Sequence, residues 1–421
     1  MKMNVKIIMT LLLCLITICM YSAEETYDIA VKNSDGVTIY YNYTNNGEEL
    51  SVTCFYYNFY NPSSSYKGTI RIPETVTFMN RTRKVTKIGD LAFYNCKIDS
   101  VSLPKTIKSI ERRAFMKCKI ESIRLPEGLE EIDYEAFLDC QMKSINIPST
   151  LKKIYAEAFN GCSYLNKVIV SDIATWFNIS FIYFWPYETT SYAYTTYPIA
   201  YGKLYSDENT QIKDLVIPEG VTTIPKYMFK GHKRLHSIKF PSSLKYVNES
   251  AFENSEIIFY LNDGLVTIGD RAFYKCSGLP SSLKLPASMK SIGKNAFVGC
   301  SFDSVYIPKN ITSIGSKAFG DCDIPEVVSL IENPFEITTD VFSTNTYYNA
   351  TLYVPIGTMD KYKATKGWKN FYYIVEGTPS GIKNVTLDKE TNIPIYDLTG
   401  RRLKKPNKGV NIISGKKIVI K

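Results

Sequence analysis

The stretch from Ile123 to Cys140, "IRLPEGLEEIDYEAFLDC", decides the fold, because close copies of it recur along most of the chain. One copy, "VSLPKTIKSIERRAFMKC", ends at Cys118, and another, "VYIPKNITSIGSKAFGDC", ends at Cys322. Ala-Phe pairs stand at 92–93, 114–115, 136–137 and 158–159, and after an interruption the phenylalanines resume and run to Phe342. About ten copies are readable, and such a fixed period is the signature of a stacked repeat array.

Each copy divides into two halves with different patterns. In the first half Ile123 and Leu125 alternate with polar residues, which predicts a short strand. Pro126 then marks a corner, because a proline inside a paired strand would remove a ladder hydrogen bond. In the second half we expect Leu129 and Ile132 to point inward and the Ala-Phe pair to place one ring on the next. A 22-residue unit cannot bury this apolar set alone, so we expect the units to stack as parallel strands about 4.7–4.9 Å apart.

The pattern I/L-x-I/L-P-x-x-[VLI]-x-x-I-x-x-x-A-F-x-x-C runs over roughly residues 69–375. It resembles the BspA-type leucine-rich repeat of bacterial surface proteins. The resemblance implies a mainly β solenoid of about ten 22-residue rungs with parallel β-sheets. It also implies an exported, surface-exposed and non-catalytic module for binding or adhesion, with a protein or glycan ligand such as host matrix.

The formal net charge of +9 comes from the two ends of the chain. Residues 24–377 carry 38 basic and 38 acidic residues, whereas residues 378–421 carry ten basic and three acidic ones. A nucleic-acid groove requires lysines and arginines clustered along one face. We therefore expect no nucleic-acid partner.

Residues 1–23 have the layout of a secretory signal peptide. Lys2 and Lys6 precede an apolar run, and the small residues Ser22 and Ala23 follow it. The run is short for a membrane span, so we predict cleavage after Ser22 or Ala23 and no transmembrane span in the mature chain. The alternative is a retained anchor.

Caps are expected at both ends of an open stack. In residues 24–68, "VTIYYNY" and "LSVTCFYY" predict a β-hairpin that closes the first rung. Near the other end we predict a short helix over the last rung, with Thr358 as its N-cap and Gly367 as its C′ residue.

Residues 378–421 leave the repeat pattern after the linker-like "TPSG" and show short strands separated by turns. The segments "IYDLTGRRL" (395–403), "KGVNII" (408–413) and the closing "GKKIVIK" are similar to the C-terminal sorting domain of Bacteroidetes proteins exported by the type IX secretion route. The alternative is a small structural β domain without an export role.

An aromatic-rich insertion at 171–212 separates the repeat blocks 69–170 and 213–377. We expect Trp176, Phe177 and Phe181 to fold back onto the stack as a distorted rung. Insertions in repeat arrays map to surface loops, and aromatic residues on loops are good contact groups. The candidate ligand contacts are therefore Tyr183, Trp185, Tyr187, Tyr192, Tyr194 and Tyr197.

Seven cysteines occupy one position of the repeat: Cys96, Cys118, Cys140, Cys162, Cys276, Cys300 and Cys322. Disulfides are common in exported proteins. In neighbouring rungs, however, equivalent cysteines would have parallel Cα–Cβ bonds, which leave their Cβ atoms farther apart than a disulfide favours. We predict a ladder of buried thiols that act as small apolar groups. In two further rungs His232 and Ser255 take this position.

No catalytic or metal-binding constellation is present in the sequence. His232 and His236 span a corner and the next strand rather than one helical face, and no cysteine pair has zinc-site spacing. Carboxylates such as Glu130 and Glu131 fall at solvent-facing positions. We predict a binding module without metal or cofactor, whose exposed strand face or 171–211 insertion contacts the ligand. The alternatives are a structural spacer and an enzyme with an unrecognised site in that insertion.

Overall fold

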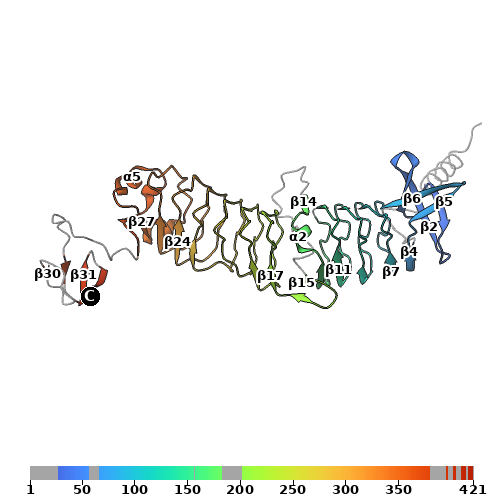
Figure 1. Cartoon of the computed structure of the whole chain (residues 1–421), viewed down its shortest axis with the longest axis horizontal. Helices are drawn as coiled ribbons and strands as arrows, with labels where there is room; N and C mark the ends of the chain where they lie inside the picture. Colours follow the sequence, from blue (N-terminus) through green and yellow to red (C-terminus); the bar gives the residue numbers. More distant parts are fainter. Residues whose placement is uncertain are drawn as a thin grey trace, which may run out of the picture. The chain divides into compact units, whose positions relative to one another are not determined.

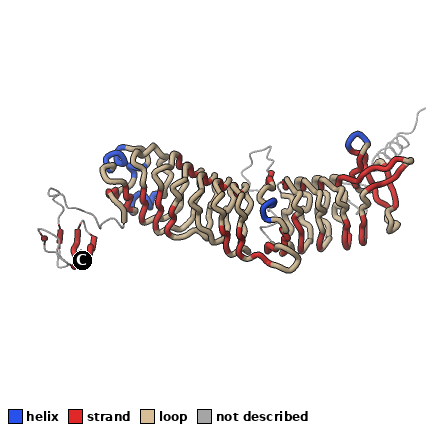
Figure 2. Tube along the Cα trace, viewed as in Figure 1, coloured by secondary structure: helices blue, strands red, loops and turns tan. Residues whose placement is uncertain are grey.

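The computed structural model describes residues 27–55, 66–155, 157–182 and 202–379, together with four short strands between residues 395 and 420. The chain divides into two compact units, Met1–Glu376 and Gly377–Lys421. Taken by itself, the first unit is a mainly β solenoid of about 12 turns, in which short strands alternate with turns and irregular chain (Figure 2). The predicted fold class is confirmed.

The first half of each rung forms a strand that ends at the proline corner. These first-half strands make four hydrogen-bonded groups, in the orders β4-β7, β9-β11-β13-β15-β16, β17-β19 and β22-β24-β26-β27-β28. All pairings in them are parallel except that of β15 with β16. The bounds are β4 (Lys67–Arg71), β7 (Lys97–Ser102), β9 (Ser122–Ile123), β11 (Ser144–Ile147), β13 (Lys167–Val170), β15 (Lys203–Tyr205), β16 (Gln211–Ile212), β17 (Asp214–Val216), β19 (Ser237–Lys239), β22 (Ser282–Lys284), β24 (Ser304–Ile307), β26 (Glu326–Ser329), β27 (Thr351–Val354) and β28 (Tyr373–Glu376).

The second half of most rungs contributes a strand on the other side of the stack, as β11 and β14 illustrate in Figure 1. These second-half strands pair in parallel in the orders β6-β8-β10-β12-β14 and β18-β20-β21-β23-β25. Their bounds are β6 (Arg81–Ile88), β8 (Ser109–Ile110), β10 (Glu131–Ile132), β12 (Lys153–Tyr155), β14 (Ser180–Ile182), β18 (Thr223–Ile224), β20 (Tyr246–Val247), β21 (Thr267–Ile268), β23 (Ser291–Ile292) and β25 (Ser313–Ile314). The two sets of strands enclose the core.

The Ala-Phe pair joins each rung to the next. The Phe115 N–H donates to the Ala136 carbonyl at 2.7 Å, and most other rungs repeat this bond. Within each block the phenylalanine rings stack with centroids 4.9–5.4 Å apart and planes within 1–10° of parallel. This buried stack confirms the predicted role of the phenylalanine.

Two tight turns surround this pair in each rung. In the rung of Phe115, Arg113 and Lys117 have φ of 55° and 58°, in the left-handed region. The turns close when the Ala114 N–H donates to the Glu111 carbonyl and the Cys118 N–H donates to the Phe115 carbonyl. The residue before alanine therefore makes the bend, whereas alanine is small enough to be fully buried there.

The N-terminal cap contains the predicted hairpin and more. Strand β2 (Thr38–Thr44) pairs antiparallel with β3 (Glu49–Thr53) across the 3-10 turn η1 (Asn45–Gly47), and β1 (Ile29–Lys32) adds a third strand. Strand β3 then pairs in parallel with β6. The sequence analysis missed a second hairpin, in which β5 (Thr75–Phe78) pairs antiparallel with β6 through positive-φ residues Met79 and Asn80.

The C-terminal cap differs in detail from the prediction. Helix α5 (Met359–Ala364) follows Thr358, but the threonine side chain donates to the Pro355 carbonyl instead of capping the helix. Glu376 accepts the first helical N–H instead. The assignment of Gly367 was wrong, because the helix ends at Ala364 and Gly367 precedes the 3-10 turn η2 (Trp368–Asn370).

The sheet also continues beyond this helix. Strand β28 pairs in parallel with β27, so the helix does not close the last rung. Before β27, the helix α4 (Thr344–Asn349) is capped by Ser343.

The start of the insertion forms an extra rung. Helix α2 (Ile173–Trp176) leads into β14, which pairs with β12, and Trp176, Phe177 and Phe181 are buried as predicted. Neither of the rings at 176 and 177 continues the parallel stack, but both contact Phe229 of the next block. This rung and the one ending in β28 help to explain why the turns outnumber the readable copies.

The second unit contains a four-stranded antiparallel sheet in the order β30-β29-β31-β32. Its strands are β29 (Ile395–Tyr396), β30 (Arg402–Leu403), β31 (Gly409–Ile413) and β32 (Lys416–Ile420).

Candidate ligand-binding face

The six aromatic residues predicted as ligand contacts lie outside the described residues, as do the predicted signal peptide and most of the predicted sorting segment. The described chain stops at Ile182, at the end of β14, and resumes at Gly202, before β15. The assignment of Tyr183, Trp185, Tyr187, Tyr192, Tyr194 and Tyr197 therefore stays a prediction.

The cysteine ladder faces the core. None of the eight described cysteines forms a disulfide, and all are buried, which confirms the thiol prediction. The Cys140 thiol donates to the Phe115 carbonyl and the Cys162 thiol to the Phe137 carbonyl, each one rung back. Burial raises the pKa of Cys162 to about 12, so this thiol stays protonated near neutral pH and is not a thiolate nucleophile.

The two histidines do not form a site. His232 is buried, and its Nδ1 accepts the N–H groups of Arg234 and Leu235 at 3.3 and 3.2 Å. Burial, and secondly the charge of Arg234, lower its pKa to about 4, so it is neutral at pH 7. His236 lies exposed just before the next strand, β19. Across the described ranges, no three His, Cys, Asp or Glu side chains are grouped so as to hold a metal ion.

Charged residues beside the second-half strands pair with one another across rungs. Lys152 and Lys108 lie 2.7 and 3.5 Å from the two carboxylate oxygens of Glu130. The hydrogen bond from Lys152 is the main reason that the pKa of Glu130 falls below its usual value. Lys87 pairs with Glu111 at 3.0 Å in the same way. These carboxylates are salt-bridge partners of lysines, not a general acid with its base.

The outer face of the first-half strands is different in the second block. Leu215 and Ile217 point into the core, so the intervening Val216 points outward, and the same alternation holds in each rung. The outward side chains from β17 to β24 include a set that we name the Lys–Tyr patch: Val216, Lys239, Ile258, Tyr260, Lys284 and Tyr306, all exposed except the half-buried Tyr306.

Strand register places the patch residues side by side. Val216 lies opposite Lys239 in the β17–β19 pairing, and Lys284 lies opposite Tyr306 in the β22–β24 pairing. The bridge between Ser237 and Ile258 brings the strand of Tyr260 beside Lys239. No strand ladder joins Tyr260 to Lys284, but the rungs that carry them stay stacked through Phe273 and Phe297, whose ring centroids are 5.4 Å apart.

The patch is open and its cations have no acidic partners. Tyr260 is 72% exposed, Val216 63% and Ile258 42%. Neither Lys239 nor Lys284 takes part in an ion pair with any residue that the structure describes. The Lys284 ammonium instead lies 5.5 Å from the centre of the Tyr306 ring. Two lysines without an acidic partner thus stand among aromatic and aliphatic side chains on successive stacked rungs.

Hydroxyl groups border the patch on its own strands. The Ser237 hydroxyl donates to Asp214, and the hydroxyls of Ser282 and Ser304 are 2.8 Å apart. Towards β27 the face closes, because the outward side chains of Val328 and Tyr353 are buried.

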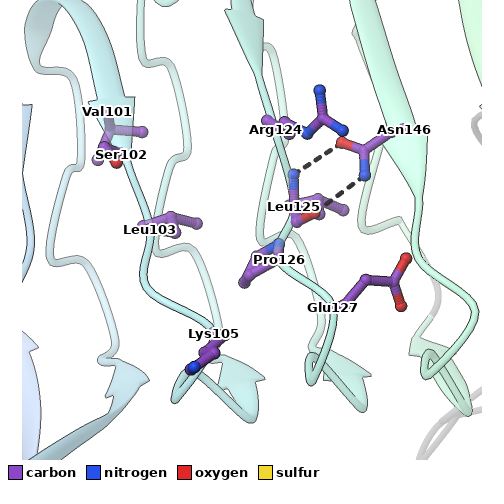
Figure 3. Close-up of a pocket in the computed structure, with 9 residues that line it drawn as sticks. All are labelled: Val101, Ser102, Leu103, Lys105, Arg124, Leu125, Pro126, Glu127 and Asn146. Atoms are coloured by element: carbon purple, nitrogen blue, oxygen red, sulfur yellow. Dashed lines mark hydrogen bonds between the residues drawn. The ribbon is translucent and has the colours of Figure 1, made fainter. Parts of the chain in front are cut away.

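The first block carries a groove on the same outer face. It encloses about 390 Å³ between the ends of β7 and β9, which do not pair with each other. Figure 3 shows Asn146 reaching across to the neighbouring rung, where its side-chain amide accepts the Leu125 N–H and donates to the Leu125 carbonyl. Arg124 and Lys105 also line the groove. Asn146 therefore does the work of a strand partner and is not available to a ligand.

The chain belongs to the family of BspA-type leucine-rich repeats. The family model matches residues 86–196, 203–324 and 257–362, which together make up more than half of the chain. This family points to a non-enzymatic repeat protein, fits a binding or adhesion module, and consists of cell-surface proteins. Among the described residues, no helix is long and apolar enough to cross a membrane.

Three solved structures are similar to this chain. The pneumococcal vaccine antigen PcpA is 14% identical, with 84% of this chain and 99% of that chain covered and a TM-score of 0.41. A leucine-rich cell-surface protein of Faecalibacterium prausnitzii is 19% identical, with 87% and 100% covered and a TM-score of 0.36. A leucine-rich-repeat protein of Bacteroides ovatus is 24% identical, with 72% and 94% covered and a TM-score of 0.28. No curated protein matches the sequence.

The sequence analysis named the exposed strand face as one of two binding surfaces but did not single out the patch residues. The signal was present in the second position of "IKFP", "FYLN", "LKLP" and "VYIP". That position alternates between lysine and tyrosine over four successive rungs.

Proposed function

We propose that this protein is an exported, surface-exposed binding module for a protein or glycan ligand. The observation that carries the proposal is the open Lys–Tyr patch, which runs over successive stacked rungs from β17 to β24. Aromatic residues on a pre-formed surface provide large contact area at low entropic cost. The aromatic residues at 183–197, which follow β14 and precede β15 in the sequence, are a second proposed contact region.

The test is binding by the chain without residues 1–23. Matrix proteins, cell-surface preparations and a glycan array should include at least one ligand that the protein retains at micromolar concentration. A variant with Val216, Tyr260 and Tyr306 changed to alanine should lose that ligand, whereas Tyr164→Ala, an exposed tyrosine outside the patch, should keep it. Retention of every ligand by the triple variant would place the binding surface elsewhere. Self-association without any ligand, measured by light scattering, would favour a spacer instead.

The second part of this proposal concerns how the protein reaches the cell surface. The signal-peptide layout of residues 1–23 supports passage across the inner membrane, and the motifs in residues 378–421 support a type IX sorting role. Deletion of 378–421 should leave the melting temperature of the solenoid nearly unchanged, because the two units are separately compact, and should retain the protein in the periplasm. Normal surface delivery of the shortened chain would show that the segment carries no sorting signal.

A further inference from the structure

We infer that the Lys–Tyr patch takes an acidic glycan, one in which carboxylated and uncharged sugars alternate. The inference rests on the proposed binding function and assigns the ligand class. It starts from the order of outward side chains on four successive rungs: Lys239, Tyr260, Lys284 and Tyr306.

The spacing of these side chains suits an extended sugar chain. Neighbouring rungs lie about 4.7–4.9 Å apart where they pair, and one pyranose ring advances an extended glycan by a comparable length. On the paired rungs a sugar chain along the stack would therefore meet Lys239 and then Tyr260, and Lys284 and then Tyr306. A tyrosine ring can stack on the apolar face of a sugar, and a lysine can pair with its carboxylate. Tyr260, at 72% exposure, offers nearly its whole ring.

The charges at the patch favour an anionic ligand. Lys239 and Lys284 have no acidic partner in the described parts of the chain, whereas many lysines beside the second-half strands do. Asp214 and Glu326 stand on the outer face at either end. A bound polyanion would thus be confined to the middle of the block, where the two lysines are.

The same residues argue against a protein ligand at this patch. The buried centres of protein interfaces are depleted of lysine, yet lysines occupy two of the four central positions here. The hydroxyls of Ser237 and Ser282 stand on the same strands, two residues before Lys239 and Lys284. Both hydroxyls already bond within the fold, Ser237 to Asp214 and Ser282 to Ser304, so the lysines and tyrosines supply the ligand contacts.

The test uses the chain without residues 1–23 and three hexasaccharide probes in calorimetry or biolayer interferometry. The first is hyaluronan, in which uronate and N-acetylhexosamine alternate. The second is the same oligosaccharide with its carboxylates reduced to alcohols, and the third is a sulfated heparin fragment. We expect hyaluronan to bind at least about tenfold more tightly than its reduced form, because two ion pairs are lost. Its affinity should fall as sodium chloride rises.

Variants connect the binding to the patch. The double change K239Q/K284Q should weaken hyaluronan binding about tenfold and remove most of its salt dependence. Tyr260→Ala should weaken it about fivefold or more, by loss of the stacking surface. The matched controls are Lys290→Gln, an exposed lysine outside the patch, and Tyr164→Ala, and both should bind as the wild type. Unchanged melting temperatures would show that each variant is folded.

The possible outcomes are distinct. Equal affinity for hyaluronan and its reduced form, or unchanged binding by K239Q/K284Q, would overturn the inference. If heparin binds more tightly than hyaluronan and K239Q/K284Q weakens that binding, the ligand class would still be an acidic glycan, but sulfate rather than carboxylate would be the recognised group. Binding of a protein ligand through the patch, with no glycan bound, would overturn the inference and leave the proposed function in place. Absence of any ligand across the wider panel would count against the proposed function itself.

Discussion

The two repeat blocks have the same pattern of buried residues but different residues on their outer faces. Inside, the first block stacks Phe93 to Phe159 and the second stacks Phe229 to Phe342 with nearly the same ring spacing. Outside, the first block offers Ser102, Arg124 and Asn146 where the second offers the Lys–Tyr patch. A rung packs only on its neighbours, so inward positions must match from rung to rung. The outward positions have no such constraint and can carry function.

The largest expected effect is at an inward position. Phe273 is fully buried, and its ring stacks at 5.4 Å on both Phe252 and Phe297. Phe273→Ala should lower the free energy of unfolding by about 3–5 kcal/mol, because it removes the ring and leaves a cavity. Denaturant melts followed by circular dichroism measure this. Phe273→Leu, which keeps most of the apolar volume, should cost less. A melt of Phe273→Ala that equals the wild type would show that the stack does not determine stability.

A second inward position should respond to pH. Unfolded histidine takes up a proton near pH 6.5, but buried His232 does so only at about 4. Between these values the unfolded state binds more protons, so stability should fall by about 2–3 kcal/mol as pH falls through this window. His232→Cys introduces the residue that most rungs have at this position and should remove this loss. The exposed control His236→Gln should retain it, and a pH slope unchanged by His232→Cys would assign the effect to other groups.

An outward residue of the first block should give an intermediate effect. Asn146 holds the N–H and the carbonyl of Leu125 at 2.8 and 2.9 Å. Asn146→Ala should cost about 1–2 kcal/mol, because two backbone groups lose their partner. Asn146→Asp, which keeps only an acceptor, should fall between alanine and the wild type in the same denaturant melts. The exposed neighbour Ser102→Ala should change little, and an equal loss from Ser102→Ala would contradict the role of Asn146.

The smallest expected effect is at the patch itself. Tyr260→Ala should change the free energy of unfolding by no more than about 0.5 kcal/mol, because the side chain is mostly solvated. The same denaturant melts test this. A loss of several kcal/mol would show that this tyrosine is a structural residue and would remove the contrast between inner and outer faces.

The sequence predicted the features that repeat and missed those that occur once. The strand corners, the phenylalanine stack and the buried thiols follow from a pattern written many times. The hairpin of β5 and β6 occurs once, although Met79-Asn80 between two alternating runs was a usable turn signal. Gly367 looked like a helix end because a glycine with positive φ is common there, but this one starts a 3-10 turn. The breaks between strand groups depend on side chains from neighbouring rungs, which no single copy reveals.

The junction between the two blocks has a mechanical consequence. Among the described residues no strand pairing crosses it, since β14 and β16 end their sheets before β17 and β18 begin the next. Trp176 and Phe177 contact Phe229 across the junction, with ring centres 5.8 and 6.2 Å apart, but no strand ladder accompanies these apolar contacts as it does between most rungs. We expect a junction without a ladder to open at lower force than the paired rungs. A molecule pulled between residue 27 and residue 376 should therefore extend first at this junction, in a step separate from the unravelling of the rungs, and single-molecule force spectroscopy would resolve the two.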